Sequence, residues 1–259
     1  MATDQFEVKS RQIQGATWFQ QPQQGRLSVG LACSESELRE SQRLRYKVFA
    51  EEQGADLHGT EPGLDEDKFD AYCRHVLVRD NESDEVIAST RVLLDLDARR
   101  AGGFYSEGEF ELDSVLTAPG RTMEIGRTCV HPDYRRGAVI SMLWSGLARL
   151  INVNEFQRII GCASIPMHDG GAGALATYAW LSRERLVSTE FNVHPRLPLP
   201  PISVAPAPLM PPLLKAYVRL GAMICGEPCW DPEFNTADML VVLDTANLQR
   251  RYVRRYLQK

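Results

Sequence analysis

This sequence lacks the features that would place a protein in a membrane, in an export pathway or on nucleic acid. No apolar run approaches the roughly twenty residues that cross a bilayer, and no cationic start leads into an apolar segment of signal-peptide length. The net charge of −5 argues against a nucleic-acid binder. No internal repeat is present. We therefore expect a cytoplasmic protein with no nucleic-acid partner.

The sequence also lacks the residue spacing of a metal site. Its six cysteines are scattered and form no CxxC pair, and no nearby histidine completes a set with Cys225 and Cys229. A calcium loop counted from Asp65 has Asp70 where glycine is required. We expect reduced, mostly buried thiols, no metal and no tightly bound cofactor. The cysteines are Cys33, Cys73, Cys129, Cys162, Cys225 and Cys229.

The hydrophobic share of 44% over 259 residues is enough to build the core of one large domain or two small ones. Apolar periodicity and turn residues predict alternating strands and helices. The expected strands cover residues 27–32, 75–79, 86–94, 158–165, 187–193 and 237–244, with a further strand beginning at 123. The expected helices cover residues 34–52, 139–153, 172–185 and 212–222.

The domain organisation follows from composition. Residues 1–26 are rich in glutamine and have no apolar period, so we expect a flexible segment there, followed by a single domain over residues 27–259. A proline-rich stretch predicts an insertion at about residues 168–212. A basic helix is expected at about residues 246–259.

The segment MEIGRTCVHPDYRRG, residues 123–137, places ionisable side chains inside an apolar strand. Glu124 and Arg127 interrupt the apolar run, and burying such groups is costly unless they are paired. Residues three apart point to opposite faces of a regular strand, so these two converge only if the strand bulges, for which Gly126 is a suitable position. Bulged strands with inward charges are typical of functional sites.

Two other patterns have simpler explanations than a site. GAGALA, residues 171–176, with Glu190 about twenty residues later, has the spacing of a dinucleotide fingerprint, but the proline-rich sequence beyond it favours tight helix packing. His131 in a turn and His75 in an apolar strand are more typical of structural histidines than of catalytic bases. No GxSxG nucleophile motif is present.

Four short motifs carry a resemblance to a known superfamily. LRYKVF places an arginine and a phenylalanine four apart on one helix, DEDKFD supplies two aspartates, ASTRV an arginine, and EIGRTCV a glutamate and an arginine. In this order they resemble the GNAT superfamily of acyltransferases, in the branch that takes acyl chains from acyl carrier protein and includes the acyl-homoserine-lactone synthases. The seven matching positions are Arg45, Phe49, Asp67, Asp70, Arg91, Glu124 and Arg127.

A closer resemblance covers about residues 38–257, in the runs LRYKVFAEEQGA, FDAYCRHVLV, EIGRTCVHPDYRRG and PPLLKAYVRLGAMICGEPCWDPEFNTADMLVVLD. These runs are similar to the ornithine N-alpha-acyltransferases, often labelled haemolysin-like. The resemblance implies an α+β, GNAT-like fold with a central mixed, mostly antiparallel, twisted sheet flanked by helices. It also implies transfer of a 3-hydroxyacyl chain from acyl carrier protein to the alpha-amino group of L-ornithine, the first step of ornithine lipid synthesis.

The expected donor is the acyl-phosphopantetheine of acyl carrier protein. Acetyl-CoA enzymes of the superfamily resemble one another in a glycine-rich loop whose amides hold the pyrophosphate, but here the loop is YRRGAVIS, with bulky Val139 and Ile140. Carrier protein is acidic, so Arg135, Arg136 and Arg149 are candidates for attracting it. An ordinary solvated basic turn remains an equal alternative for each arginine.

The expected chemistry requires a base for the amine and hydrogen-bond donors for the oxyanion. Glu124 is the candidate base, directly or through a water, and its alternative is a structural ion pair with Arg127. Backbone amides of Thr128, Cys129 and Val130 are candidates for the oxyanion and the acyl chain. Arg45 with Asp67 or Asp70 offers charges for the acceptor's carboxylate and second ammonium, whereas Arg91 and Arg127 more plausibly hold the architecture.

Several alternatives stay open. The enzyme could acylate another amino acid or make an autoinducer, and the haemolysin label suggests a non-enzymatic, membrane-active protein. The basic C-terminal helix is suited to peripheral contact with the cytoplasmic face of an anionic membrane, or to packing over the sheet. The apolar stretch at residues 195–214 is suited to lining an acyl tunnel or to packing across the fold.

Overall fold

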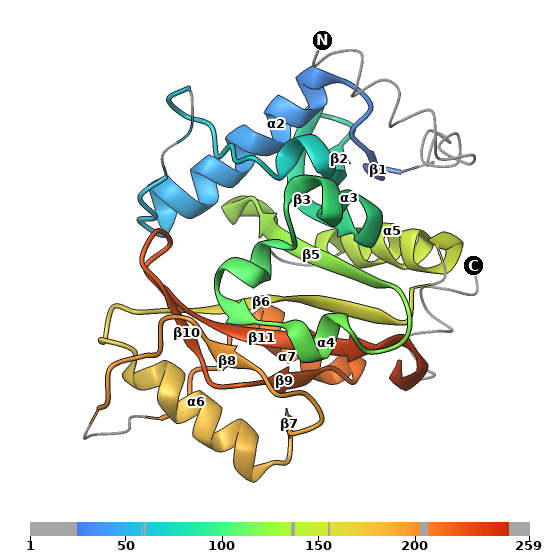
Figure 1. Cartoon of the computed structure of the whole chain (residues 1–259). Coiled ribbons are helices and arrows are strands. Elements are labelled where there is room, and N and C mark those ends of the chain that lie inside the picture. The colour runs from blue at the N-terminus through green and yellow to red at the C-terminus, as the bar shows by residue number, and fades with distance from the viewer. Residues whose placement is uncertain are drawn as a thin grey trace. The chain divides into compact units, whose positions relative to one another are not determined.

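The computed structural model describes residues 25–57, 59, 61–135, 138–154, 156–202 and 207–248. The chain folds into two units, and each combines segments that are distant in the sequence (Figure 1). Unit 1 takes its residues from Met1–Leu93 and Gly126–Asn154, and unit 2 from Leu94–Ile125 and Glu155–Lys259. One boundary falls inside a strand, so the segment that contains Glu124 and Arg127 contributes to both units.

Unit 1 is built on strands in the order β1, β2, β3 and the second half of β5. Strand β2 pairs antiparallel with β1 on one side and with β3 on the other. Helix α5 packs against β1 and β2. The elements are β1 (Leu27–Leu31), α2 (Glu35–Tyr46), a π-helical continuation (Lys47–Glu52), a 3-10 turn (Asp70–Tyr72), β2 (Arg74–Asp80), β3 (Glu85–Leu94), β5 (Thr122–Val130), a second 3-10 turn (Pro132–Tyr134) and α5 (Val139–Asn154).

Helix α2 begins at a capping residue and buries one face. The Ser34 hydroxyl accepts a hydrogen bond from the Glu37 amide at 3.2 Å, which satisfies a donor that the first turn would otherwise leave unpaired. Leu44 and Val48, four apart, lie on the buried face. They form one core cluster with residues of three strands and the turn after β1, namely Ala32, Leu77, Val86 and Cys129.

Unit 2 is built on the long strands β6 and β11, which pair antiparallel from Arg158 opposite Asp244 to Pro166 opposite Thr236. The first half of β5 pairs parallel with β6, and α6 and α7 pack against β6. The elements are α3 (Asp95–Ala101), a 3-10 turn (Tyr105–Gly108), β4 (Phe110–Glu111), α4 (Asp113–Leu116), β6 (Arg158–Pro166), α6 (Ala172–Arg183), β7 (Val187–Ser188), β8 (His194–Pro195), α7 (Pro212–Leu220), β9 (Met223–Cys225), β10 (Cys229–Asp231), β11 (Thr236–Asp244) and a 3-10 turn (Thr245–Asn247).

Most predicted elements are confirmed, with one exception. The strand expected over residues 187–193 is wrong in length, because only Val187–Ser188 is paired. Its partner β9 has three residues and ends before Gly226, which adopts a φ of 77°. A strand with so short a partner has nowhere to continue its ladder. Helix α7 ends at Gly221, with a φ of 104°, as predicted.

The glycines of GAGALA serve helix packing. The Asp169 carboxylate accepts hydrogen bonds from the amides of Gly171 and Gly173, at 3.0 and 2.7 Å. A Cβ atom added to Gly171 would lie 2.9 Å from Met167 Sδ. A protein carboxylate therefore occupies the N terminus of α6, where a dinucleotide site would hold its pyrophosphate.

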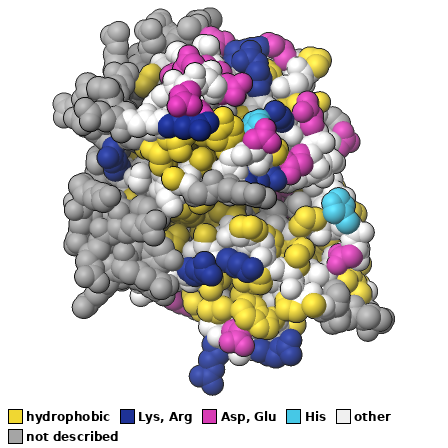
Figure 2. Space-filling view, turned by 180° about the vertical axis from the view of Figure 1, so that it is seen from behind, with side chains coloured by type: hydrophobic (Ala, Val, Ile, Leu, Met, Phe, Trp, Pro, Cys, Tyr) yellow, Lys and Arg dark blue, Asp and Glu magenta, His cyan; other side chains and the backbone are white. Residues whose placement is uncertain are grey.

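The proline-rich stretch exposes part of its apolar surface. Leu197 and Leu209 are 42% and 48% exposed, and Trp230, whose amide bonds to the Leu197 carbonyl, is 37% exposed. On the face shown in Figure 2, hydrophobic side chains gather in patches that lie beside lysine and arginine side chains. Of the helices that the structure describes, none has both the length and the apolarity to span a bilayer. The predicted mobile start (residues 1–24) and basic end (residues 249–259) lie outside the described residues.

Candidate functional site

A buried ion-pair network in unit 1 joins three arginines to three aspartates. At its centre Arg45, on α2, binds Asp70 with two parallel hydrogen bonds of 2.8 Å each. Its Nε donates to Asp65 at 2.9 Å, and its Nη2 also donates to the Asp65 carbonyl. The Gln42 amide donates to Asp70 at 3.0 Å. Arg45 is 0% exposed, so every part of its charge is satisfied by neighbours within the protein.

The other two arginines extend this network. Arg91, inside β3, donates to Asp67 at 2.7 Å and to Asp70 at 2.8 Å. Arg127, on β5, lies 3.2 Å from Asp65 and 3.4 Å from Asp67. The Asp67 side chain is 22% exposed, the highest value among the six charged groups, so it marks the open edge of the network. Each aspartate contacts two arginines, which makes the cluster close to electrically neutral.

The strand irregularity lies one residue later than expected. Arg127, rather than Gly126, adopts a left-handed conformation, with a φ of 50°. This conformation costs about 1–2 kcal/mol for a residue with a side chain. The two ion pairs of Arg127 fix its side chain at the same point, which accounts for a charged residue where glycine would be less strained.

Burial and charge act in opposite directions on the aspartates. Burial alone would raise the pKa of Asp70, but the Arg45 guanidinium overrides it and holds that pKa well below its usual range. Burial likewise opposes, and Arg91 outweighs, the lowering of the pKa of Asp67. Both carboxyls are therefore ionised at neutral pH. His75 completes the cluster, with its Nε2 3.1 Å from the Asp70 carbonyl.

His75 should make stability depend on pH. Its burial lowers the pKa to about 4, against 6.5 for an accessible histidine, although the nearby Asp70 opposes the shift. Between these values the unfolded chain binds the proton and the folded chain does not, so stability is fully present above pH 6.5 and is lost as pH falls toward 4. The shift corresponds to about 3 kcal/mol.

Urea unfolding of the wild type and His75→Gln between pH 4 and 7.5 measures this contribution. Glutamine can place a donor near the Asp70 carbonyl but does not titrate, so the difference between the two curves should narrow as pH falls. His194→Gln, at an exposed histidine, is the matched control. A constant difference across this range would contradict the assignment.

The structure gives Arg45 a different environment from the one expected of a substrate ligand. Its guanidinium is enclosed, and Asp65 and Asp70 occupy its donors, so no face is open to an acceptor carboxylate. Asp65 and Gln42, which sequence reasoning did not assign to the site, are full members of the network. Phe49 packs against the core cluster of unit 1.

In unit 2, Glu124 lies at the centre of a second polar cluster. It is 4% exposed and accepts hydrogen bonds from the amides of Tyr105 and Ser106, at 2.7 and 2.8 Å. The Ser106 hydroxyl also donates to it. These bonds hold the start of the 3-10 turn against β5. The described bonds of Glu124 lie in unit 2 and those of Arg127 in unit 1, so each charge has partners in its own unit.

The remaining candidates follow the end of β5. Thr128 and Val130 are half-buried, whereas the Cys129 side chain is buried in the core cluster. Burial raises the pKa of the Cys129 thiol to about 12, so this thiol stays protonated. His131 caps the turn that follows by accepting from the Asp133 amide at 3.3 Å, and its other ring nitrogen lies 2.7 Å from Lys47. This is the structural arrangement expected of a turn histidine.

The candidate carrier-binding arginines differ from one another. Arg135 forms a two-bond ion pair with Glu52, both bonds being 2.5 Å, so much of its charge is compensated within unit 1. Its side chain remains 42% exposed. Arg149 is half-buried on α5, and Arg136 lies outside the described residues.

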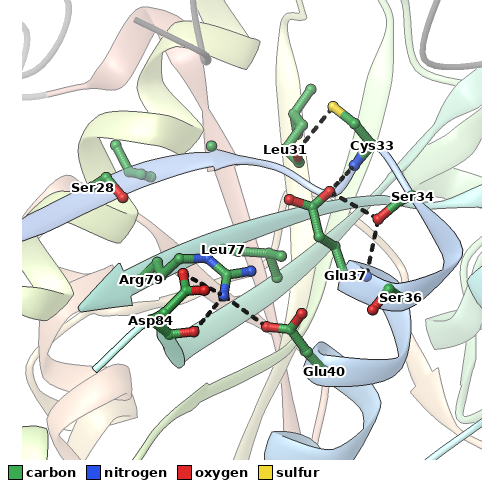
Figure 3. Close-up of a pocket in the computed structure, with 12 residues that line it drawn as sticks. Ser28, Leu31, Cys33, Ser34, Ser36, Glu37, Glu40, Leu77, Arg79 and Asp84 are labelled. Carbon is green, nitrogen blue, oxygen red and sulfur yellow. Dashed lines mark hydrogen bonds and ion pairs between the residues drawn. The ribbon is translucent and has the colours of Figure 1, made fainter. Parts of the chain in front are cut away.

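A separate pocket of about 530 Å³ lies in unit 1 between β1, β2 and the start of α2 (Figure 3). Its charged side chains are paired, since Arg79 contacts Glu40 at 2.9 Å and Asp84 at 3.3 Å, and Glu37 accepts from the Cys33 amide. None of the residues that line it is among the candidates above.

Comparison with known proteins connects these clusters to a family. Residues 44–145 match the model of the acetyltransferase (GNAT) domain. The fold resembles that of FeeM, an N-acyl amino acid synthase from uncultured soil microbes, with a TM-score of 0.54 at 10% identity, over 92% of this chain and 97% of that one. It also resembles a CoA-dependent acyl-homoserine lactone synthase, BjaI, with a TM-score of 0.52 at 15% identity, over 85% and 80%.

In sequence, the chain is 34% identical over 251 residues to an L-ornithine N(alpha)-acyltransferase of Agrobacterium fabrum (strain C58 / ATCC 33970), which covers 90% of this chain and 85% of the relative. The predicted GNAT-like, α+β fold with a mixed sheet flanked by helices is confirmed. The chain is an acyltransferase and belongs to the family that contains the L-ornithine N(alpha)-acyltransferases.

Proposed function

We propose that this chain transfers a 3-hydroxyacyl chain from acyl carrier protein to the alpha-amino group of L-ornithine, giving lyso-ornithine lipid. The observation that carries the proposal is the 34% identity, over 90% of the chain, to a protein named for ornithine N(alpha)-acylation. An alignment of that length includes segments of both units, so it covers the ion-pair network as well as the Glu124 cluster.

The reaction joins the amine nitrogen to the thioester carbonyl carbon and breaks the carbon–sulfur bond. The amine loses one proton, and the departing pantetheine sulfur gains one. In the proposed mechanism Glu124 accepts the amine proton, directly or through a water. Backbone N–H groups of residues 128–130 are the proposed donors to the oxyanion of the tetrahedral intermediate.

The geometry of Glu124 supports this role through orientation. Two backbone amides and the Ser106 hydroxyl all donate to its carboxylate, which fixes the group on β5. The network in unit 1 has a different proposed role. Arg45, Asp70 and Arg91 are almost fully buried and hold the architecture, whereas Asp67 is the proposed contact to substrate at the open edge.

The first turn of α5 supports a carrier-bound donor. Val139, which starts the helix, is 4% exposed, and Ile140 follows it, so bulky side chains stand where a pyrophosphate loop would place small ones. Arg135 and Arg149 are the described candidates for contact with the acidic carrier. The ion pair of Arg135 with Glu52 means that a carrier carboxylate would compete with Glu52 for it.

Purified protein, L-ornithine and matched 3-hydroxyacyl donors test this proposal. Mass spectrometry should detect N-acyl-ornithine with the carrier-bound donor, and kcat/KM should be at least about tenfold lower with the same acyl chain on CoA. A panel of other amino acids serves as the acceptor control.

Three outcomes would contradict the proposal. Activity with acetyl-CoA alone would exclude the carrier-bound donor, and acylation of another amino acid in preference to ornithine would change the acceptor. Liposome leakage without any acyl donor, together with no acylation, would favour a membrane-active protein.

A further inference from the structure

A buried acidic cluster in unit 2 has no role in the mechanism above. Glu109 follows the 3-10 turn that Glu124 holds, and Asp238 lies inside β11. Their carboxylate oxygens and the Cys162 sulfur, on β6, lie within 4.8 Å of one another. Glu109 and Asp238 are 8% and 3% exposed. Two carboxyl groups this close in a buried site repel each other when both are ionised.

One oxygen of this cluster lacks a partner. Glu109 Oε2 accepts a hydrogen bond from Cys162 Sγ at 3.1 Å, but Glu109 Oε1 is buried and has no hydrogen-bond partner among the residues that the structure describes. A buried acceptor without a donor costs about 1–3 kcal/mol, so such groups call for an explanation. A ligand that brings donors and positive charge would remove both the unpaired acceptor and the repulsion.

The cluster is connected to the proposed base. Ser106 donates to Glu124 and lies 3.3 Å from Cys162 Sγ, which in turn donates to Glu109. Only two side chains therefore separate the Glu124 carboxylate from that of Glu109. A small molecule with two amino groups can reach both positions when one amine is at Glu124.

We propose that Glu109 and Asp238 form the site that binds the side-chain ammonium of the acceptor, so that unit 2 selects a diamino acid over a neutral one. The inference rests on the proposed function for the identity of the acceptor. An ammonium brings three donors and one positive charge to two carboxylates, which matches what the cluster lacks. Asp231, which accepts from the Tyr105 hydroxyl at 3.3 Å, adds a further negative charge nearby.

A divalent metal is the alternative ligand for the same three side chains. Metal binding requires Cys162 as a thiolate. Burial and the charge of Glu109 raise the pKa of this thiol well above its usual range. In the structure the thiol instead serves as a hydrogen-bond donor to Glu109. The cluster therefore favours an ammonium, which needs no deprotonated sulfur.

Calorimetric binding of L-ornithine and L-norvaline to the purified protein tests the proposal without any acyl transfer. Norvaline has the ornithine skeleton but lacks the side-chain amine. The wild type should bind ornithine at least about tenfold more tightly, and Glu109→Gln and Asp238→Asn should each reduce that preference to within about threefold. Glu111→Gln, an exposed glutamate two residues away, is the matched control and should keep the preference.

The outcomes separate this inference from the proposed function. Equal binding of the two amino acids by the wild type, or an unchanged preference in both variants, would overturn the inference even if ornithine is acylated. Stoichiometric Zn²⁺ binding that Glu109→Gln abolishes, with the ornithine preference intact, would also overturn it in favour of a metal site. If the preference depends on Glu109 but catalysis uses another cationic acceptor, the inference stands and the proposed function fails.

Discussion

Glu124→Gln is expected to lower kcat/KM for N-acylation by at least about 100-fold, the usual contribution of a positioned general base. The substitution keeps the size of the side chain but removes its ability to take a proton. In the wild type, log(kcat/KM) should fall at low pH as the base becomes protonated, and this acid-side fall should be absent from the variant. Steady-state kinetics across a pH series measure both effects.

Folding must be checked separately, because glutamine would direct an amide donor at an amide of the 3-10 turn and cost about 1–3 kcal/mol. Ser106→Ala is the control for the turn, since it removes one hydrogen bond to Glu124 and leaves the carboxylate in place. If Glu124→Gln keeps kcat/KM within threefold of the wild type, or keeps the acid-side fall, Glu124 only holds the turn.

Asp70→Asn is expected to destabilise the protein by about 3–5 kcal/mol, because it leaves buried arginine charge uncompensated. Asp70 accepts two hydrogen bonds from Arg45 and one from Arg91, and both arginines are nearly inaccessible to water. Asparagine is almost the same size, so the loss reflects charge and hydrogen bonding rather than a cavity. Urea unfolding at pH 7 gives the free energy of unfolding for comparison.

The chain offers a matched surface control for this change. Asp84 pairs with Arg79, but its side chain is 88% exposed, and asparagine tolerates its φ of 57°. Asp84→Asn should therefore change stability by less than about 1 kcal/mol. If Asp70→Asn costs no more than Asp84→Asn, the network would contribute nothing beyond an exposed ion pair.

The sequence specified local structure better than it specified the site. Helix α2 and strands β2, β3, β6 and β11 have clear caps or apolar periods, so their positions were predictable. Strand β10 has only three residues and no period of its own. The strand after α6 was predicted too long, because strand length depends on the partner as well as on composition.

The arginines of the network were found through motif resemblance, and their burial was not. Arg45 appeared as a substrate ligand in the sequence, whereas the structure encloses it among aspartates of a loop that follows. Asp65 gave no signal of its own, because one more acidic residue in an acidic loop has no distinguishing pattern. The six charges were recognisable as a group only once the chain was folded.

The Glu109 and Asp238 pair illustrates the other limit. The two residues are far apart in the sequence and meet because β11 runs antiparallel to β6. The signal that was available is an aspartate inside the apolar run ADMLVVLD, a position where a buried charge needs an explanation. Its partner could not be named without the strand register.

The interleaving of the two units also sets the order in which a growing chain can fold. Unit 1 needs residues up to Asn154 before its set of segments is complete, and unit 2 cannot pair β6 until β11 has been synthesised. Pairing strands that are distant in sequence closes a large loop and is slow. During translation, β6 must wait with an unpaired edge while the next seventy or so residues emerge, so chains arrested in this interval are the ones we expect to depend on chaperones.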